Sequence, residues 1–169
     1  VAVRAPNVLV ASNNDPAKNI AELIAYLKKN PDKVSFASAG AGSSDHLTAA
    51  LFWQKSGTSG LHVPYKGGAP ALTDLLGGQV AVSFVNINTA LSHLKAGKLK
   101  ALAVTGDKRA AILPNVPTLA ESGVKGVDIY SWQAVAAPKG LPKDVKARLH
   151  GEIVAALNEP GLKAKPTAQ

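Results

Sequence analysis

Short apolar runs alternate with longer amphipathic stretches along most of this chain, and this rhythm limits the fold more than any other feature. Each run is a brief apolar segment bounded by glycine, proline, serine or asparagine, which is typical of a buried strand. The runs cover residues 8–11, 34–37, 61–64, 80–85 and 99–104. Strands that alternate with helices indicate βαβ units. The sequence therefore predicts an α/β fold with a mostly parallel sheet flanked by helices.

Helix start and stop signals frame the amphipathic stretches. Asp15 can cap a helix and Pro16 suits its first position, after which apolar residues recur with helical spacing up to Leu27. Thr118 and Glu121 have the spacing of a capping box, which predicts a short helical turn. The predicted helices cover residues 16–30, 44–56, 70–76, 88–95 and 142–157.

The rhythm stops after Gly123, where one long strand over residues 129–136 is expected instead of another βαβ unit. It resembles the strand that crosses between the lobes of a two-lobed protein. The last predicted helix carries a stripe of four apolar residues, Val145, Leu149, Ile153 and Leu157. We expect residues 163–169 to be unstructured.

Composition excludes several classes of protein. The 169 residues suit one domain or slightly more, and the apolar fraction of 46% rules out intrinsic disorder. Zero Cys excludes disulfides and thiolate metal sites, and the four His lack metal-ligand spacing, so we expect no metal and no cofactor. No apolar stretch is long enough to cross a bilayer. The absence of Met suggests that Val1 is an interior or processed start.

The net charge of +8 raises the question of nucleic-acid binding. The lysines are scattered singly or in pairs, and the chain has only two Trp, three Tyr and three Phe. Basic and aromatic residues therefore do not form the interleaved stripe that nucleic-acid binding requires. We expect no nucleic-acid partner, and a positive field that favours small anions.

A glycine-rich loop over residues 38–44 joins a predicted strand to a predicted helix. Ligands of open α/β sheets bind at the carboxyl ends of the strands, and free N–H groups at a helix start suit an anion. The loop matches neither a dinucleotide fingerprint nor a phosphate loop. An ordinary tight turn with Ser43 or Ser44 as N-cap is an equally good reading of these residues alone. The candidate ligand-binding residues here are Ser38, Gly42, Ser43, Ser44 and His46.

Two further loops follow the next strands and are predicted to reach the same edge of the sheet. In the first, Tyr65 offers a hydroxyl, while Gly67, Gly68 and Ala69 expose backbone donors. In the second, Asn86 and Asn88 are candidate donors, although Asn88 is slightly better explained as a helix cap.

Catalytic arrangements are weak in this sequence. No pair of carboxylates is suggestively spaced, and the nucleophile-elbow pattern Gly-x-Ser-x-Gly is absent. Ser43 or Ser44 with His46 would be the only nucleophile and base to consider. We expect the protein not to be an enzyme.

Four stretches carry a family resemblance. They are residues 38–47, in the pattern Ser-x-Gly-x-Gly-Ser-x-x-His-Leu, residues 62–80, which begin His-Val-Pro-Tyr-Lys-Gly-Gly-Ala-Pro-Ala-Leu, and residues 96–104 and 113–118. They closely resemble the solute-binding proteins of tripartite tricarboxylate transporters, the Bug family. The resemblance implies a periplasmic-binding-protein-like α/β fold of two lobes joined by crossing strands, a periplasmic location, a small organic acid as ligand and the transporter's membrane subunits as partners.

The resemblance also implies how the chain is divided. Residues 1–13 and 127–140 would be crossing strands, residues 14–126 the second ligand-binding lobe, and residues 141–169 a first-lobe helix and tail. The family's opening strand and first ligand loop would then precede Val1. We expect such a single lobe to bind carboxylates far more weakly than a two-lobed protein. We expect its final helix to pack against a second copy through the exposed stripe, to dock in a non-native place or to be poorly ordered.

One position departs from the family pattern. Many relatives carry Asp directly after the strand that contains Ser83 and Phe84, where this chain has Val85. That Asp would accept a hydrogen bond from an amine or hydroxyl of the ligand. Its absence here favours a plainer acid without such a group, or a more apolar acid. Uptake for a transporter is the leading hypothesis, and a periplasmic sensor that presents the bound carboxylate to a signalling partner is the alternative.

Overall fold

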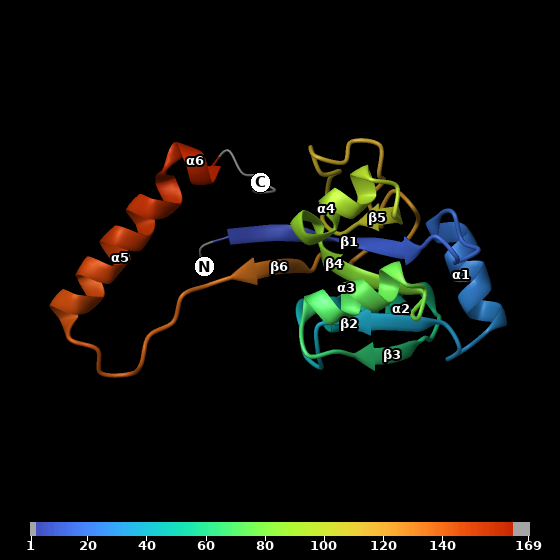
Figure 1. Cartoon of the computed structure of the whole chain (residues 1–169). Coiled ribbons are helices and arrows are strands. Elements are labelled where there is room, and N and C mark those ends of the chain that lie inside the picture. Colours follow the sequence, from blue (N-terminus) through green and yellow to red (C-terminus); the bar gives the residue numbers. More distant parts are fainter. Residues whose placement is uncertain (1–2, 164–169) are drawn as a thin grey trace.

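The computed structural model describes residues 3–163. Its elements follow in the order β1 (Val3–Ser12), α1 (Ile20–Lys29), β2 (Ser35–Ser38), α2 (Ser44–Ser56), β3 (Leu61–Pro64), α3 (Gly68–Leu76), β4 (Val82–Asn86), α4 (Ile87–Lys95), β5 (Leu99–Val104), β6 (Tyr130–Gln133), α5 (Lys143–Asn158) and α6 (Pro160–Lys163). Figure 1 shows β1 to β5 gathered with α1 to α4 in one lobe, while β6 leads away from it towards α5.

The sheet has the strand order β3-β2-β4-β1-β5, and β6 pairs with the beginning of β1. β2 is parallel to both β3 and β4. β1 is antiparallel to β4, β5 and β6, so it runs against the shared direction of β2 to β5. The α/β class is confirmed, but the expectation of a mostly parallel sheet needs correction, because the sheet is mixed.

Helix α1 explains why β1 is reversed. Two strands joined by a helix are parallel only when the helix returns the chain from the end of the first strand to the opposite end of the sheet. Figure 1 shows α1 beyond the end of the sheet, where β1 ends and β2 begins. The alternation of strand and helix is therefore the same as in a βαβ unit, although no crossover takes place.

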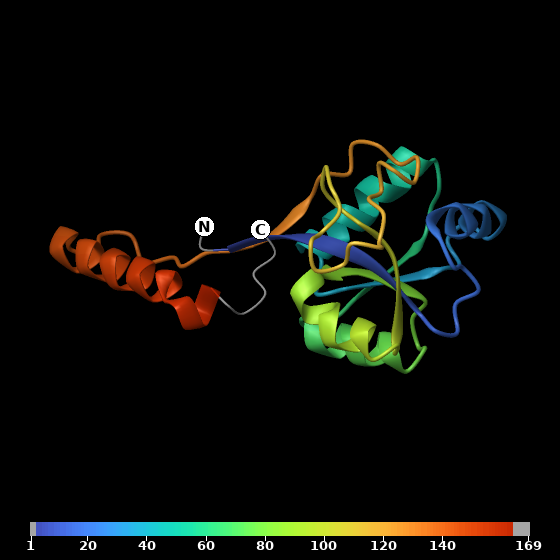
Figure 2. The same cartoon turned by 90° about the horizontal axis from the view of Figure 1, so that it is seen from above.

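Helices cover both faces of the sheet, with α2 on one face and α3 and α4 on the other (Figure 2). Successive residues of β1 face opposite clusters, so Leu9 packs in the cluster that contains Phe52 of α2, and Val8 packs in the cluster that contains Leu75 of α3. A strand buried on both faces needs apolar residues at every position. This is why the strand runs are continuous in the sequence.

The start of α1 differs from the prediction. The helix begins at Ile20 because the Asn19 side chain caps it, accepting the Glu22 N–H at 2.9 Å. Asp15 instead closes a tight turn, in which its Oδ1 accepts the Ala17 N–H at 2.8 Å. Asp and Asn stabilise such turns as readily as helix starts, so the sequence signal fitted both positions.

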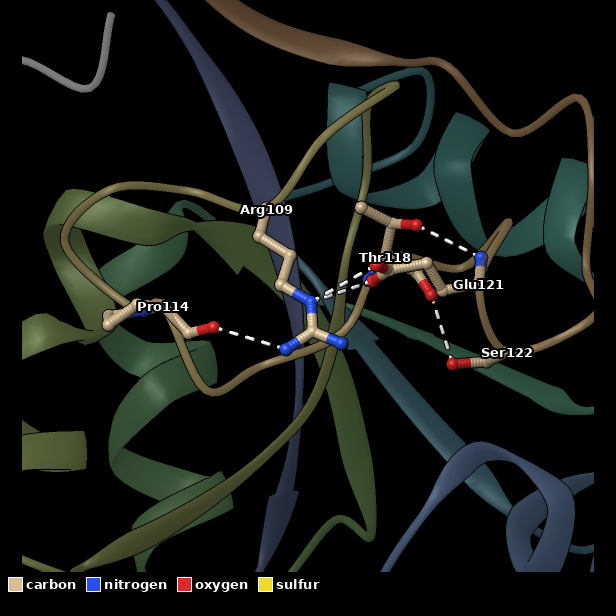
Figure 3. A network of polar contacts seen from close by, with 5 residues as sticks. All are labelled: Arg109, Pro114, Thr118, Glu121 and Ser122. Atoms are coloured by element: carbon tan, nitrogen blue, oxygen red, sulfur yellow. Dashed lines mark hydrogen bonds and ion pairs between the residues drawn. The ribbon is translucent and has the colours of Figure 1, made fainter.

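The capping box predicted at Thr118 and Glu121 is present (Figure 3). Thr118 N–H donates to Glu121 Oε2 at 2.8 Å, and Glu121 N–H donates to Thr118 Oγ1 at 3.0 Å. Arg109 pairs with Glu121 at 2.9 Å and also donates to the Pro114 carbonyl at 3.2 Å. The Thr118 N–H bond and then the Arg109 bond lower the pKa of Glu121. These hydrogen bonds therefore stabilise the irregular segment after β5, between residues 109 and 121.

Strand β6 ends at Gln133, which pairs with Val3, so it is shorter than the predicted strand over residues 129–136. The next helix, α5, has no buried residue, and Val145, Leu149 and Leu157 are 40%, 48% and 36% exposed. Self-association through this stripe stays a prediction. Most of the tail expected to be unstructured, residues 164–169, lies outside the described residues, whereas Lys163 closes α6. None of the described helices has the length and apolarity that crossing a membrane requires.

Candidate ligand-binding edge

The three predicted ligand loops lie at one edge of the sheet. β2, β3 and β4 are parallel neighbours, so their carboxyl ends meet there. The loops after β2 and β3 are joined by backbone hydrogen bonds from Tyr65 N–H to the Ser38 carbonyl at 2.9 Å and from Gly67 N–H to the Ala39 carbonyl at 3.0 Å. The predicted arrangement is confirmed. We call residues 38–46, 64–69 and 86–89 the ligand edge.

The glycine loop connects β2 to the start of α2 at this edge. Gly42 has φ +79°, in the left-handed region that favours glycine. Ser43 is the N-cap, where its Oγ accepts the His46 N–H at 3.4 Å and donates to the Gly40 carbonyl at 2.7 Å. The capping reading of Ser43 is thus confirmed. The N–H groups of Ser44 and Asp45 in the first turn have no intrahelical acceptor, and they form the positive end of the helix dipole.

Helix α3 begins without any side-chain cap. Its N-cap is Gly67, with φ +113°, and the exposed Gly68 and Ala69 follow it. The N–H groups of Gly68 and Ala69 belong to the first turn and lack intrahelical partners, whereas Pro70 has no N–H to satisfy. Two backbone donors and a helix dipole therefore face outward together.

Helix α4 begins directly after β4. Asn86 Oδ1 accepts the Asn88 N–H at 2.9 Å, so the side chain that caps the helix is that of Asn86 rather than that of Asn88. Within the described residues, the buried Oδ1 of Asn88 has no hydrogen-bond partner. Val85 is 7% exposed and packs in the apolar cluster with Val8. The position where the family resemblance led us to expect Asp is therefore part of the core in this chain.

Two candidate side chains make their strongest contacts inside the protein. Tyr65 donates its hydroxyl to Asp74 Oδ2 at 2.6 Å, and this hydrogen bond raises the pKa of Tyr65 to about 12. The hydroxyl proton is thus committed to Asp74. Ser38 is 1% exposed, and its Oγ lies 2.6 Å from His62 Nε2. The Ser38 hydroxyl also forms hydrogen bonds with the backbone of Gly40 in the glycine loop.

The chain is similar to known proteins along most of its length. Residues 1–166 match the family described as the tripartite tricarboxylate transporter family receptor. The chain belongs to this receptor family. Within it, the periplasmic binding protein BugD is 40% identical, with a TM-score of 0.92 over 96% of this chain and 55% of BugD.

Two solved structures of similar proteins contain dicarboxylates. Rpa4515 of R. palustris, solved with adipate, is 36% identical with a TM-score of 0.91. MatC from Rhodopseudomonas palustris, solved with bound malate, is 30% identical with a TM-score of 0.91. Each match covers 96% of this chain and 55% of the other. The receptor-family chain described here also spans about half the length of most of the curated relatives it matches.

Sequence reasoning missed two residues that shape the ligand edge. Asp45 Oδ2 accepts the Ala39 N–H at 2.7 Å and so holds the glycine loop against α2. Asn7 of β1 is fully buried and donates from Nδ2 to Thr48 Oγ1 of α2 at 3.1 Å. An acidic residue in a first helical turn was a usable signal for Asp45. A polar residue beside an apolar run was the only signal for Asn7.

Proposed function

We propose that this chain forms one wall of a binding site that captures a small carboxylate for a tripartite tricarboxylate-type transporter in the periplasm. In this proposal residues 14–126 are a ligand-binding lobe, and β1 and β6 are the strands that connect it to a second lobe. The ligand is an organic acid without an amine that requires a carboxylate partner, because Val85 provides none.

The observation that carries the proposal is the uncapped start of α3 beside the start of α2. Helix N-termini bind anions through free N–H groups and the positive end of the dipole. Neutral donors are sufficient for a carboxylate, so a buried arginine is not required. The adipate and malate bound by similar proteins support an acid of this class. The net charge of +8 favours the approach of such an anion.

The contacts of the serines and histidines support binding rather than catalysis. Ser43 donates its hydroxyl to the Gly40 carbonyl at 2.7 Å, so its proton is not directed to His46. His46 Nδ1 accepts the Gly42 N–H at 3.0 Å. Ser44 donates its hydroxyl to Asp45 Oδ1 at 3.2 Å, so neither Ser43 nor Ser44 is hydrogen-bonded to His46 as a nucleophile to its base. Ser38 does lie 2.6 Å from His62 Nε2, but it is only 1% exposed and is therefore not open to a substrate. We therefore propose a binding protein that leaves its ligand chemically unchanged.

Gly68→Val tests the proposal. A Cβ at Gly68 meets nothing within 4 Å, so the variant should fold with a stability within about 0.5 kcal/mol of the parent. The added side chain covers the start of α3, and a hydrogen bond to a charged group contributes about 1.5–3 kcal/mol. We expect the dissociation constants for adipate and malate, measured by amide-shift titration, to rise about tenfold or more.

Gly151→Val is the matched control, because Gly151 of α5 also has open space around its Cβ and lies outside the ligand edge. We expect it to leave both dissociation constants unchanged. Equal affinities in the parent and in a folded Gly68→Val variant would contradict the proposed site.

A further inference from the structure

Two histidine rings are stacked next to the glycine loop, where Gly42 N–H donates to one of them. His46 lies in the first turn of α2 and His62 lies in β3, and their ring centroids are 3.9 Å apart with an interplanar angle of 6°. Residues from two separate elements are thus held in parallel contact at the ligand edge. The function proposed above gives this pair no role.

One hydrogen bond to the His46 ring requires its Nδ1 to be unprotonated. Gly42 N–H donates to His46 Nδ1 at 3.0 Å, so Nδ1 carries a lone pair. Both ring nitrogens of an imidazolium are donors. The contact therefore exists only while Nδ1 is unprotonated, and Gly42 N–H is not available to a ligand in this state.

The surroundings of the pair disfavour two protons but tolerate one. Burial and then repulsion from His46 lower the pKa of His62, while Asp45 acts in the opposite direction. Asp45 is held in place by the Ala39 N–H at 2.7 Å and the Ser44 hydroxyl at 3.2 Å. From the loop after β3, Tyr65 is hydrogen-bonded to Asp74 of α3 and Lys66 is exposed. Asp45 is thus the charged side chain that favours a proton on His62.

We propose that carboxylate capture is linked to the uptake of one proton by the His46–His62 pair. When Nδ1 of His46 binds a proton, it can no longer accept the Gly42 N–H. The Gly42 N–H and the new Nδ1–H of His46 are then both donors, with their nitrogens 3.0 Å apart in this structure, and both need an acceptor. A carboxylate at the start of α2 accepts from both, and the imidazolium adds a full positive charge beside it.

The sign of the linkage follows from this exchange, and it rests on the proposed carboxylate function. A bound carboxylate stabilises the protonated pair, so protonation strengthens carboxylate binding by the same factor. Affinity should therefore rise as pH falls through the range in which the pair takes up its proton. One linked proton limits the gain to about tenfold per pH unit, because one pKa unit corresponds to about 1.4 kcal/mol.

The test compares the pH dependence of adipate and malate binding in the parent, in His46→Asn and in His93→Asn. Asn offers an acceptor to the Gly42 N–H but does not titrate, and His93 lies in the last turn of α4, outside the ligand edge. Between about pH 7.5 and about pH 6.0, we expect the affinity of the parent and of His93→Asn to rise about fivefold or more. His46→Asn should show only the smaller change that comes from titration of the ligand itself.

A second readout uses the parent protein alone and does not depend on the folding of a variant. At about pH 6.5, saturation with adipate should move the ring signals of His46 towards those of imidazolium. Binding that is equally dependent on pH in the parent and in His46→Asn, or ring signals that do not move, would overturn the proton linkage but leave the carboxylate site intact. Absence of binding at every pH would overturn both.

Discussion

Phe52→Ala is expected to lower the free energy of unfolding by about 3–5 kcal/mol. Phe52 of α2 is fully buried, and its ring lies 6.4 Å from that of Phe36 in β2 and 5.7 Å from that of Phe84 in β4. The packing of these three rings holds α2 against β2 and β4, two of the strands that end at the ligand edge. A loss of this size is a large part of the total stability of a typical domain, about 5–15 kcal/mol.

Urea unfolding measures this effect, and Leu47→Ala on the same helix is its control. Leu47 is 50% exposed, so its truncation should change the free energy of unfolding by no more than about 0.5 kcal/mol. If the two variants lost similar amounts, the aromatic cluster would not be what holds α2 in place.

Asn7→Asp is expected to lower the free energy of unfolding at neutral pH by about 3–5 kcal/mol, because it buries a charge without a partner. Asn7 is fully buried, and its Nδ2 donates to Thr48 Oγ1 at 3.1 Å. Thr48 in turn donates its hydroxyl to the Ser44 carbonyl at 2.6 Å. A carboxylate in place of the amide would face the Thr48 oxygen with no proton between them, which weakens the connection from β1 to the first turn of α2.

The same variant should depend on pH in a defined direction. Burial would raise the pKa of the introduced carboxyl above its unfolded value of about 3.9, so the loss of stability is greatest above the folded pKa and shrinks as pH falls through it. Asn115→Asp makes the same change of charge at an exposed position and should show neither effect. Urea unfolding of both variants, at neutral and at acidic pH, checks the size and the sign. Equal losses for the two variants would mean that Asn7 is not the buried connection described here.

Strands and helices with strong local signals were predicted well from the sequence. Residues 44–56 form α2 as expected, because Ser43 caps its start and Gly57 ends it with φ +61°. β3 and β5 also have the predicted bounds. The direction of β1 was not predictable from periodicity, because a helix that caps the sheet end and a helix that crosses the sheet have the same apolar pattern.

The candidate site was predicted at the level of loops but not at the level of atoms. Parallel strands bring their carboxyl ends to one edge, so the position of the three loops followed from the strand predictions. Which donors are free depends on contacts between residues far apart in the sequence. Tyr65 is committed to Asp74, and Gly42 to His46, by hydrogen bonds that spacing alone does not specify. The stacking of His46 on His62 likewise arises only when β3 pairs beside β2.

The central claim is that a carboxylate binds where the starts of α2, α3 and α4 meet, and amide chemical-shift mapping tests it most directly because it detects even weak binding. Nitrogen-15-labelled protein would be titrated with adipate and, as a neutral control of the same length, with hexane-1,6-diol. We expect adipate, and not the diol, to shift the amide signals of five residues at the ligand edge and its helix starts most strongly: Ser44, Asp45, Gly68, Ala69 and Ile87. Shifts centred on the opposite edge of the sheet, around residues 30–34 and 77–81, or equal shifts with the diol, would contradict the account.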